Sequence, residues 1–512
     1  MPRLLLRTRP RSQALAFVAA TALALSACGS NLDPSAVSAG RGGGAAGTVG
    51  MTSAAGAALS GSSSGQPLVD PGVSGAGSAG FDSAASGSSG TSTEAGTASS
   101  DGSAGSGDPG TTGSGAGTGG TTPDDNTATG DGPAGDCAGF SNTTGITDST
   151  ITLANVADIS GPVPGLFESA RQATQAFITY YNSSEELCGR KLDLLPLDSR
   201  GDAGADQQAY ATACDKAFAA VGSVSAFDAG GSATAEACGL PDVRSATVTP
   251  ERQGCASCFA AYTVSTSTIA ASLPSYWLKA EPQASEHVGI FYVNVAAAKV
   301  NAEAFARAYE RAGMTVDVLQ PIDTGEFNYA TYAQQMKDND IEFVQYFGPY
   351  QFTIKLQQAM AQQSFVPKVF LQDPTIYDAN YLKQAGDLAD DAYVFTTNEL
   401  FDDTSIGEMA LYRSWLERVA PGAVPNYYGL YAWSAARLFV EEATALGGKL
   451  GRASLVSSLE SVTKWTGNGL HSPMEVGRKT TSPCIKIIQY DGSAWGSVSG
   501  KNFTCGALIN AG

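Results

Sequence analysis

The chain from residue 150 onward alternates short apolar segments with amphipathic ones, and this alternation limits the folds that are open to it. Residues 150–158 (TITLANVAD) have the pattern of a strand. Residues 168–181 have that of a helix with one apolar stripe, formed by Ala170, Ala173, Phe177 and Tyr181. Strands that alternate with helices form parallel sheets covered by helices on both faces. The sequence therefore predicts the α/β class.

The predicted strands fall into two groups. The first comprises 150–158, 191–199, 223–230 and 244–250, and the second comprises 287–294, 315–322, 341–348, 368–374 and 391–400. Further helices are expected between the strands, for example at 205–220 and 299–312. Because one sheet seldom holds this many strands, the two groups predict two doubly wound parallel-sheet lobes.

The last third of the chain has a different pattern. Helical segments follow one another at 405–419, 427–446 and 452–462, and a late strand follows at 484–492. A strand after consecutive helices indicates that the chain returns to a lobe begun earlier, so we expect a multi-strand hinge with a cleft between the lobes. The expected boundaries are 136–273 with 396–465 for the N-terminal lobe and 274–395 with 466–512 for the C-terminal lobe.

The first residues have the pattern of an export signal. Four arginines precede an apolar stretch at 14–27, which is too short for a permanent membrane span. Leu25-Ser26-Ala27-Cys28 resembles the lipobox of bacterial lipoproteins, which implies removal of a signal peptide at 1–27 and lipid on the Cys28 thiol. The alternative is a plain secretory signal with an incidental cysteine.

Residues 28–135 are rich in Gly, Ser, Ala and Thr, and Phe81 is their one aromatic residue. Such a segment has too little apolar surface to offset its ordering entropy, so we expect a disordered linker. Because of the export signal and the lipobox-like motif, the protein is expected outside the cytoplasm, on the cell membrane or outer envelope. With 49 acidic against 30 basic residues, the net charge of −19 disfavours nucleic acid as a partner.

Eight of the nine cysteines remain once Cys28 is set aside, and an even number in an exported domain suggests up to four disulfides. The local pairs Cys484–Cys505 and Cys255–Cys258 are candidates, although sequence cannot assign the pairing. Cys255-Ala-Ser-Cys258 also matches a redox motif, but it is expected in a polar loop rather than at a helix start after a strand. The two histidines, His287 and His471, lack spaced partners, so we expect neither a metal site nor a cofactor.

Ligands of open parallel sheets bind beyond the carboxyl ends of the strands. The candidate loops are therefore 159–167, 228–236, 249–255, 292–301, 347–352 and 371–375.

Four segments, taken in order, resemble the type I periplasmic solute-binding proteins, in the branch of the leucine/isoleucine/valine-binding proteins of ABC importers. They are GITDSTITLANVADISGP (145–162), CGRKLDLLPLDSRGD (188–202), IEFVQYFGPY (341–350) and NYYGLYAWSAARLFVEEATALGG (426–448). The resemblance spans about 145–500. It implies two lobes, a small-molecule ligand between them and an ABC permease as the membrane partner.

Several residues are candidates for ligand contact. In GGSATAE, the hydroxyls of Ser232 and Thr234 and the backbone N–H groups suit a carboxylate, although Ser232 also suits a helix cap. The resemblance implies that Asp373 pairs with a ligand amine, where the alternative is an Asp-Pro turn. It also places Tyr350 in the cleft and Ser160 in the Ser-Gly-Pro turn. The remaining candidates are Glu251 and two aromatics that cover the ligand or belong to the core, Phe167 and Tyr292.

Two departures from the family pattern bear on the ligand. AAAKVNAE lacks the Tyr-Gly pair of many relatives, and Glu251-Arg252-Gln253 is charged where small residues are usual. The charged loop argues against a branched-chain aliphatic ligand. We expect a solute-binding lipoprotein for a small polar metabolite, foremost an amino acid or a related amide or carboxylate, that serves an ABC importer. The alternative is a sensor that signals to a membrane partner. No enzyme is expected, because no His-centred constellation is present.

Overall fold

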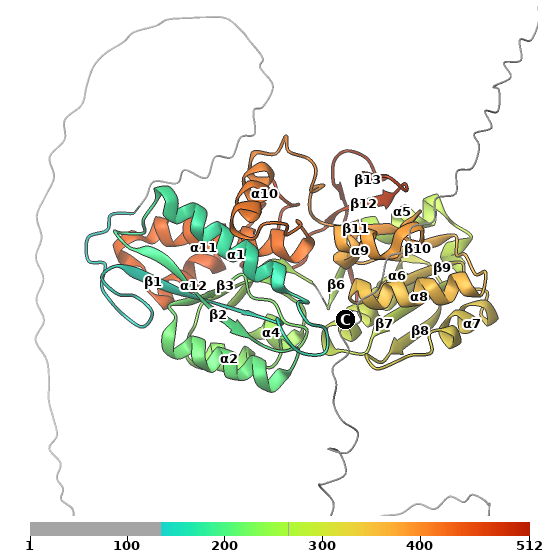
Figure 1. Ribbon diagram of the computed structural model, residues 1–512, viewed down its shortest axis with the longest axis horizontal. Coiled ribbons are helices and arrows are strands. Elements are labelled where there is room, and N and C mark those ends of the chain that lie inside the picture. Colours follow the sequence, from blue (N-terminus) through green and yellow to red (C-terminus); the bar gives the residue numbers. More distant parts are fainter. Residues whose placement is uncertain (1–134, 265) are drawn as a thin grey trace, which may run out of the picture. The chain divides into compact units, whose positions relative to one another are not determined.

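The computed structural model describes residues 135–264 and 266–512 (Figure 1). The predicted signal peptide (1–27), the lipid site at Cys28 and the predicted linker up to residue 134 lie outside the described residues. Among the described helices, none combines the length and the apolar character needed to cross a membrane.

The first sheet has five parallel strands in the order β2-β1-β3-β4-β5. Its strands are β1 (Thr150–Ala157), β2 (Lys191–Asp198), β3 (Ala219–Val221), β4 (Asp242–Thr247) and β5 (Cys258–Thr263). The helices between them are α1 (Glu168–Ser184), α2 (Ala203–Lys216), α3 (Ser232–Ala237) and α4 (Pro250–Gly254). Every residue of β3, β4 and β5 is buried, as expected for parallel strands covered on both faces.

The second sheet has the order β13-β12-β11-β10-β9-β7-β8, with β14 on β12. Its parallel strands are β7 (Val288–Val293), β8 (Val316–Ile322), β9 (Phe343–Phe347), β10 (Val369–Gln372) and β11 (Tyr393–Thr396). Antiparallel strands extend it: β12 (Cys484–Tyr490), β13 (Trp495–Ser497) and β14 (Thr504–Cys505). A separate pair joins β6 (Thr268–Ala270) to β15 (Leu508–Asn510).

One helix precedes the strands of the second sheet, and four others follow β7, β8, β9 and β10 in turn. They are α5 (Ser272–Ala280), α6 (Ala296–Ala312), α7 (Ala330–Asp338), α8 (Tyr350–Gln362) and α9 (Ala379–Ala385). Short 3-10 turns are η2 (Ala284–Glu286), η3 (Pro374–Ile376), η4 (Gly386–Ala389) and η5 (Gly447–Lys449). The predicted class, α/β with two doubly wound parallel sheets, is confirmed.

Three late helices return to the first sheet. They are α10 (Gly407–Val419), α11 (Tyr427–Leu446) and α12 (Arg452–Glu460), and Figure 1 shows them in orange and red beside α1. Helix α11 packs on α1 and β4, with the ring centroids of Phe177 and Trp433 at 5.0 Å. The described chain thus passes from the first sheet to the second after β5, back after β11, and to the second sheet again at β12.

The prediction of a strand at 223–230 is wrong, because the strand is β3 and lies earlier. The predicted helix at 205–220 overran into it; helix α2 ends at Lys216. Gly222 ends β3 with a positive φ of +66°, and a Cβ there would lie 2.1 Å from the Thr174 hydroxyl oxygen. Beyond Gly222 the chain forms a loop at the carboxyl end of β3.

The prediction of a polar loop at the CxxC segment is correct for the loop and wrong for its surroundings, because residues 255–257 form a turn between α4 and β5 and both cysteines belong to an apolar cluster. Cys255 and Cys258 are buried, at 1% and 0% exposure, and Cys258 begins β5, a strand that the sequence pattern did not reveal. Four disulfides join the eight described cysteines: Cys137–Cys188, Cys214–Cys238, Cys255–Cys258 and Cys484–Cys505.

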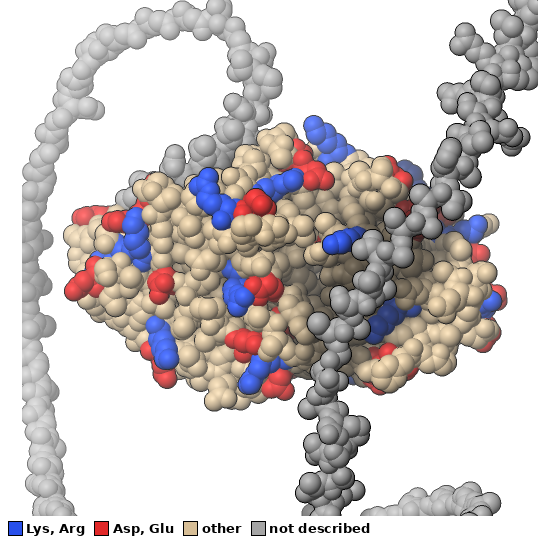
Figure 2. Space-filling model, in the orientation of Figure 1, with Lys and Arg blue, Asp and Glu red and all other residues tan. Residues whose placement is uncertain are grey.

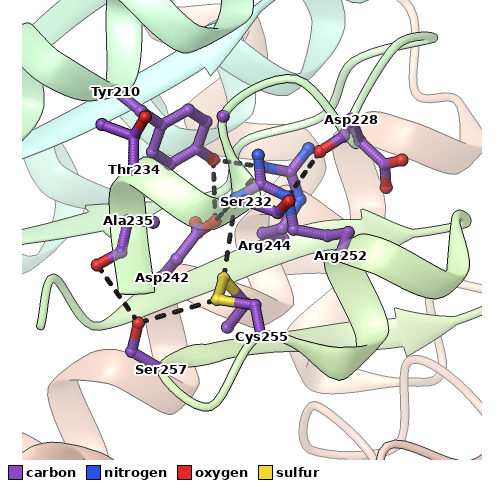
Figure 3. Close-up of a disulfide and its surroundings, with 12 residues drawn as sticks. Tyr210, Asp228, Ser232, Thr234, Ala235, Asp242, Arg244, Arg252, Cys255 and Ser257 are labelled. Carbon is purple, nitrogen blue, oxygen red and sulfur yellow. Dashed lines mark hydrogen bonds and ion pairs between the residues drawn. A yellow bond between two sulfur atoms is a disulfide. The ribbon is translucent and has the colours of Figure 1, made fainter. Parts of the chain in front are cut away.

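A buried ion cluster lies behind the first sheet's loops, beside the Cys255–Cys258 disulfide (Figure 3). Its members are all fully buried: Asp206, Tyr210, Asp242, Arg244 and Arg252. Arg252 pairs with Asp242 at 3.0 Å and with Asp206 at 3.2 Å, and Arg244 pairs with Asp242 at 3.2 Å. Two cations and two anions balance, which offsets the cost of removing each from water.

The ion cluster also holds a strand-end loop in place. Arg252 Nε donates to the Asp228 carbonyl at 2.7 Å, and the Gly231 N–H donates to Asp206 Oδ2 at 2.8 Å. The loop from Asp228 to Gly231 is therefore fixed to the interior of the first sheet's half.

Removing one member of this cluster should be costly. We predict that Arg252→Leu lowers the free energy of unfolding by about 3–5 kcal/mol, because Asp206 loses its cation and Asp242 keeps only Arg244. Urea unfolding of the full chain measures this. The matched control is Arg478→Leu, whose side chain is 73% exposed and pairs with Glu475, and it should cost less than about 1 kcal/mol. Equal, small effects of the two variants would contradict this account of the cluster.

Candidate functional site

A cavity of about 240 Å³ lies where the carboxyl ends of the two sheets' strands face each other. Its lining includes Val224 and Ala226 from the loop after β3, Val293 and Asn294 at the end of β7, and Asp373 after β10. Because both sheets contribute, a molecule in the cavity touches both halves of the structure. This is the position where open α/β sheets bind ligands.

Aromatic rings line the cavity on both sides. Phe167, Tyr262, Tyr427 and Tyr428 lie on the side of the first sheet, where Phe167 and Tyr428 meet edge to face at 4.7 Å. Phe305, Phe347 and Phe395 lie on the side of the second sheet, with Phe305 5.0 Å from Phe347 and 5.1 Å from Phe395. The lining is therefore mostly apolar, and it suits a ligand with an apolar body.

Three aspartates fix the loops of the first sheet. Asp158 accepts from the Gly201 N–H at 2.9 Å, from the Ala226 N–H at 2.8 Å, and from the hydroxyls of Ser199 and Ser225. It therefore ties three strand-end loops together, and both of its oxygens have donors. This is a structural use of a buried carboxylate that lines the cavity.

The other two aspartates act in the same way. Asp198 accepts from the N–H groups of Ile159, Ser160 and Arg200, and from the Ser160 hydroxyl at 2.6 Å. Asp228 accepts from the N–H groups of Val248 and Thr249 and from the Thr249 hydroxyl at 2.6 Å. The backbone N–H groups named here thus donate to side chains of the protein.

Asp373 is the second carboxylate in the lining, and it differs from Asp158. Its Oδ1 accepts from the N–H of Thr375 at 2.9 Å and from the Thr375 hydroxyl, so it caps η3. No Lys, Arg or His of the described chain forms an ion pair with it. Burial raises the pKa of the Asp373 carboxyl to about 6.

The residues proposed from the sequence divide into two sets. Ser160, Phe167 and Asp373 line the cavity. Outside its lining lie Ser232, Thr234, Glu251, Tyr292 and Tyr350. Ser232 Oγ donates to the Ala229 carbonyl at 2.8 Å, and Tyr292 is buried in the core of the second half. Tyr350 lines a neighbouring depression beside α8, where Gln384 donates to its hydroxyl at 3.3 Å. Ligand contact by any of them stays a prediction.

The charged segment 251–253, predicted as part of a loop, lies on α4 and does not bring charge into the cavity. Arg252 belongs to the buried ion cluster, and Glu251 is exposed on α4. Gln253 donates to the carbonyls of Val248 and Val264 at 3.0 and 2.6 Å. The sequence argument against an aliphatic ligand therefore loses its basis.

Other lining residues were missed by the sequence analysis. Tyr427 and Tyr428 begin α11, far along the chain from the loops first considered, and Phe305 lies inside a helix. Helical spacing alone marks such residues as core.

Charges of both signs are interspersed over the face shown in Figure 2. Within the described ranges, no three His, Cys, Asp or Glu side chains are grouped to hold a metal ion.

The pKa of Asp373 leads to a test of burial. The carboxyl binds a proton more tightly in the folded than in the unfolded chain, so its contribution to stability is greatest below about pH 4 and is lost as the pH rises through 6. We predict that Asp373→Asn raises the free energy of unfolding by about 1–2 kcal/mol at pH 8 and by much less at pH 4. Urea unfolding at the two pH values measures this. The exposed control Asp215→Asn should change by less than about 0.5 kcal/mol at either pH. A gain that does not depend on pH would contradict the assignment.

Comparison with known proteins agrees with this geometry. A profile described as periplasmic binding protein matches residues 150–494. No curated protein sequence matches the chain.

Solved structures share the fold at low sequence identity. A fatty acid ABC transporter substrate-binding protein from Thermomonospora curvata is 17% identical, with a TM-score of 0.62, over 72% of this chain and 95% of that one. A branched-chain amino acid transporter substrate-binding protein from Streptococcus pneumoniae, solved with isoleucine, is 14% identical, with a TM-score of 0.58, over 68% and 99%. A solute-binding protein from R. palustris, solved with 4-hydroxybenzoate, is 13% identical, with a TM-score of 0.58, over 71% and 97%.

Members of the matched family are extracytoplasmic proteins that bind small solutes and work with ABC permeases. With the family profile matched over most of the folded chain and the two-sheet architecture in common, this chain belongs to the type I periplasmic binding proteins of ABC transporters.

Proposed function

We propose that this protein captures a small solute in the cavity between its two sheets and delivers it to the permease of an ABC importer. The observation that carries the proposal is a cavity lined from the strand ends of both halves. A ligand held there stabilises the closed arrangement, because it gains contacts from both halves only when they approach. The chain passes between the sheets at three places, which supports closure by a hinge.

The ligand that the lining favours has an apolar body. The rings on both sides of the cavity suit a hydrocarbon or aromatic group, and Asp373 supplies a carboxylate for a group that donates hydrogen bonds. The solved relatives bind isoleucine and 4-hydroxybenzoate, and a third is named for fatty acids. An amino acid with an apolar side chain, or a related amide or carboxylate, remains within the size of the cavity. The protein returns its ligand unchanged, as expected of a carrier.

We also propose that the mature protein is tethered to the membrane through a lipid on Cys28, and that residues 29–134 act as a linker. The basic start, the apolar stretch and the lipobox-like Leu25-Ser26-Ala27-Cys28 support this.

The tether is tested by Cys28→Ser in the native host. The wild-type protein should incorporate a labelled fatty acid and enter the detergent phase of a Triton X-114 separation, and the variant should do neither. Ser26→Ala keeps a small residue in the motif and should behave as the wild type. A wild-type protein that is unlabelled and stays in the aqueous phase would show that the segment is a plain secretory signal.

The cavity is tested with two substitutions on one helix. Ala298 lines the cavity, whereas Ala296 is exposed two residues earlier on α6 and does not. We screen the full chain by calorimetry against amines, amino acids and carboxylic acids and expect saturable binding of one ligand per chain. Ala298→Trp fills the cavity and should weaken binding at least 100-fold, while Ala296→Trp should change it less than about threefold.

Two results would contradict the proposal. One is conversion of the bound compound into a product. The other is binding that survives Ala298→Trp unchanged, because the ligand would then occupy another site.

A further inference from the structure

The side chains that line the cavity are unbalanced in charge. Two of them are carboxylates, Asp158 and Asp373, and none of the described lining residues is Lys, Arg or His. Asp158 is fully engaged by backbone and hydroxyl donors of three loops. Neither carboxylate forms an ion pair within the described chain, and Asp373 accepts hydrogen bonds from the N–H and the hydroxyl of Thr375. An ionised carboxylate in a buried, mostly apolar lining costs free energy unless a cation or a hydrogen-bond donor pairs with it.

Several donors of the cavity lining already bond to side chains of the protein. Ser160 Oγ donates to Asp198, Ser225 Oγ to Asp158, and Asn294 Nδ2 to Asp323 at 2.7 Å. The backbone N–H groups of Ala226 and Val248 donate to Asp158 and Asp228. An anionic ligand would need N–H groups of the first sheet's loops, and the protein's own carboxylates already accept hydrogen bonds from those named here.

Acceptors, in contrast, remain available. Asn301 on α6 lines the cavity, and its Oδ1 is buried without a hydrogen-bond partner. Asp373 lies after β10, and burial raises the pKa of its carboxyl, which forms no ion pair with a Lys, Arg or His of the described chain. A ligand that brings N–H donors would satisfy groups that the protein leaves unmatched.

The aromatic lining adds a second attraction for positive charge. Tyr262, Tyr427 and Tyr428 on one side and Phe305 and Phe347 on the other present π systems to the cavity. A cation near the face of such a ring is attracted by its quadrupole, and more strongly where water is excluded. An anion gains nothing from the ring faces.

From these observations we propose that the ligand is an organic cation: an amine on an apolar body that carries no carboxylate, with Asp373 as its counterion and Asn301 as a further acceptor. This inference rests on the proposed function of the cavity and narrows its ligand class. The carboxylate of a zwitterionic amino acid at the first sheet's loops would compete with Asp158, Asp198 and Asp228 for their donors. A fatty or aromatic acid would place it beside Asp373.

The test compares probes that share one carbon skeleton and differ in charge. Phenethylamine, phenylalanine and 3-phenylpropionate form one set, and hexylamine, norleucine and hexanoate form another. Calorimetry with the full chain at pH 7.5 should show at least one amine bound ten times more tightly than the amino acid and the acid of the same skeleton. Asp373→Asn should weaken that amine at least tenfold and leave the acid unchanged or improved, whereas Asp215→Asn should alter neither.

Each outcome has a distinct meaning. Tighter binding of the amino acid or the acid overturns the cation assignment and leaves the solute-binding function standing. The same holds if neither amine binds while another metabolite of the wider screen does. Binding of an amine that is unaffected by Asp373→Asn overturns the role of Asp373 as counterion. If no compound of any class binds, the proposed function fails as well.

Discussion

The shape of the cavity wall depends on carboxylates that accept hydrogen bonds from the loops at the carboxyl ends of the parallel strands. Loops at the carboxyl ends of strands carry N–H groups without partners in the sheet. Where such a loop is buried beside a cavity, these N–H groups need hydrogen-bond acceptors if the loop is to keep one conformation. In the first sheet Asp158, Asp198 and Asp228 supply these acceptors. Their hydrogen bonds run from one loop to the next, so the loops that form this wall of the cavity are linked to one another.

The ion cluster behind this wall extends the same principle into the interior. The buried side chain of Arg252 on α4 forms ion pairs with Asp206 and Asp242 and donates a hydrogen bond to the carbonyl of Asp228. A loop that is charged in sequence thus contributes no charge to the cavity. The described lining is mostly apolar and holds two carboxylates but no Lys, Arg or His.

Sequence patterns were sufficient for the fold because periodicity and strand–helix alternation follow directly from burial. They failed locally where other forces decide. Gly222 ends β3 by its positive φ, and the small residues of 219–221 had extended the helix pattern instead. For the site, strand-end loops were the right region, and Ser160, Phe167 and Asp373 line the cavity. The rings of Tyr427, Tyr428 and Phe305 were missed because their approach to the cavity depends on how α6 and α11 pack, which spacing along the chain does not reveal.

In the proposed function one small molecule contacts both halves of the structure at once. Amide hydrogen exchange of the full chain, with and without a saturating ligand, measures this most directly. We expect added protection in 224–228 on one side and in 293–298 and 373–375 on the other. Protection confined to one side, or to a region away from the cavity, would contradict the claim.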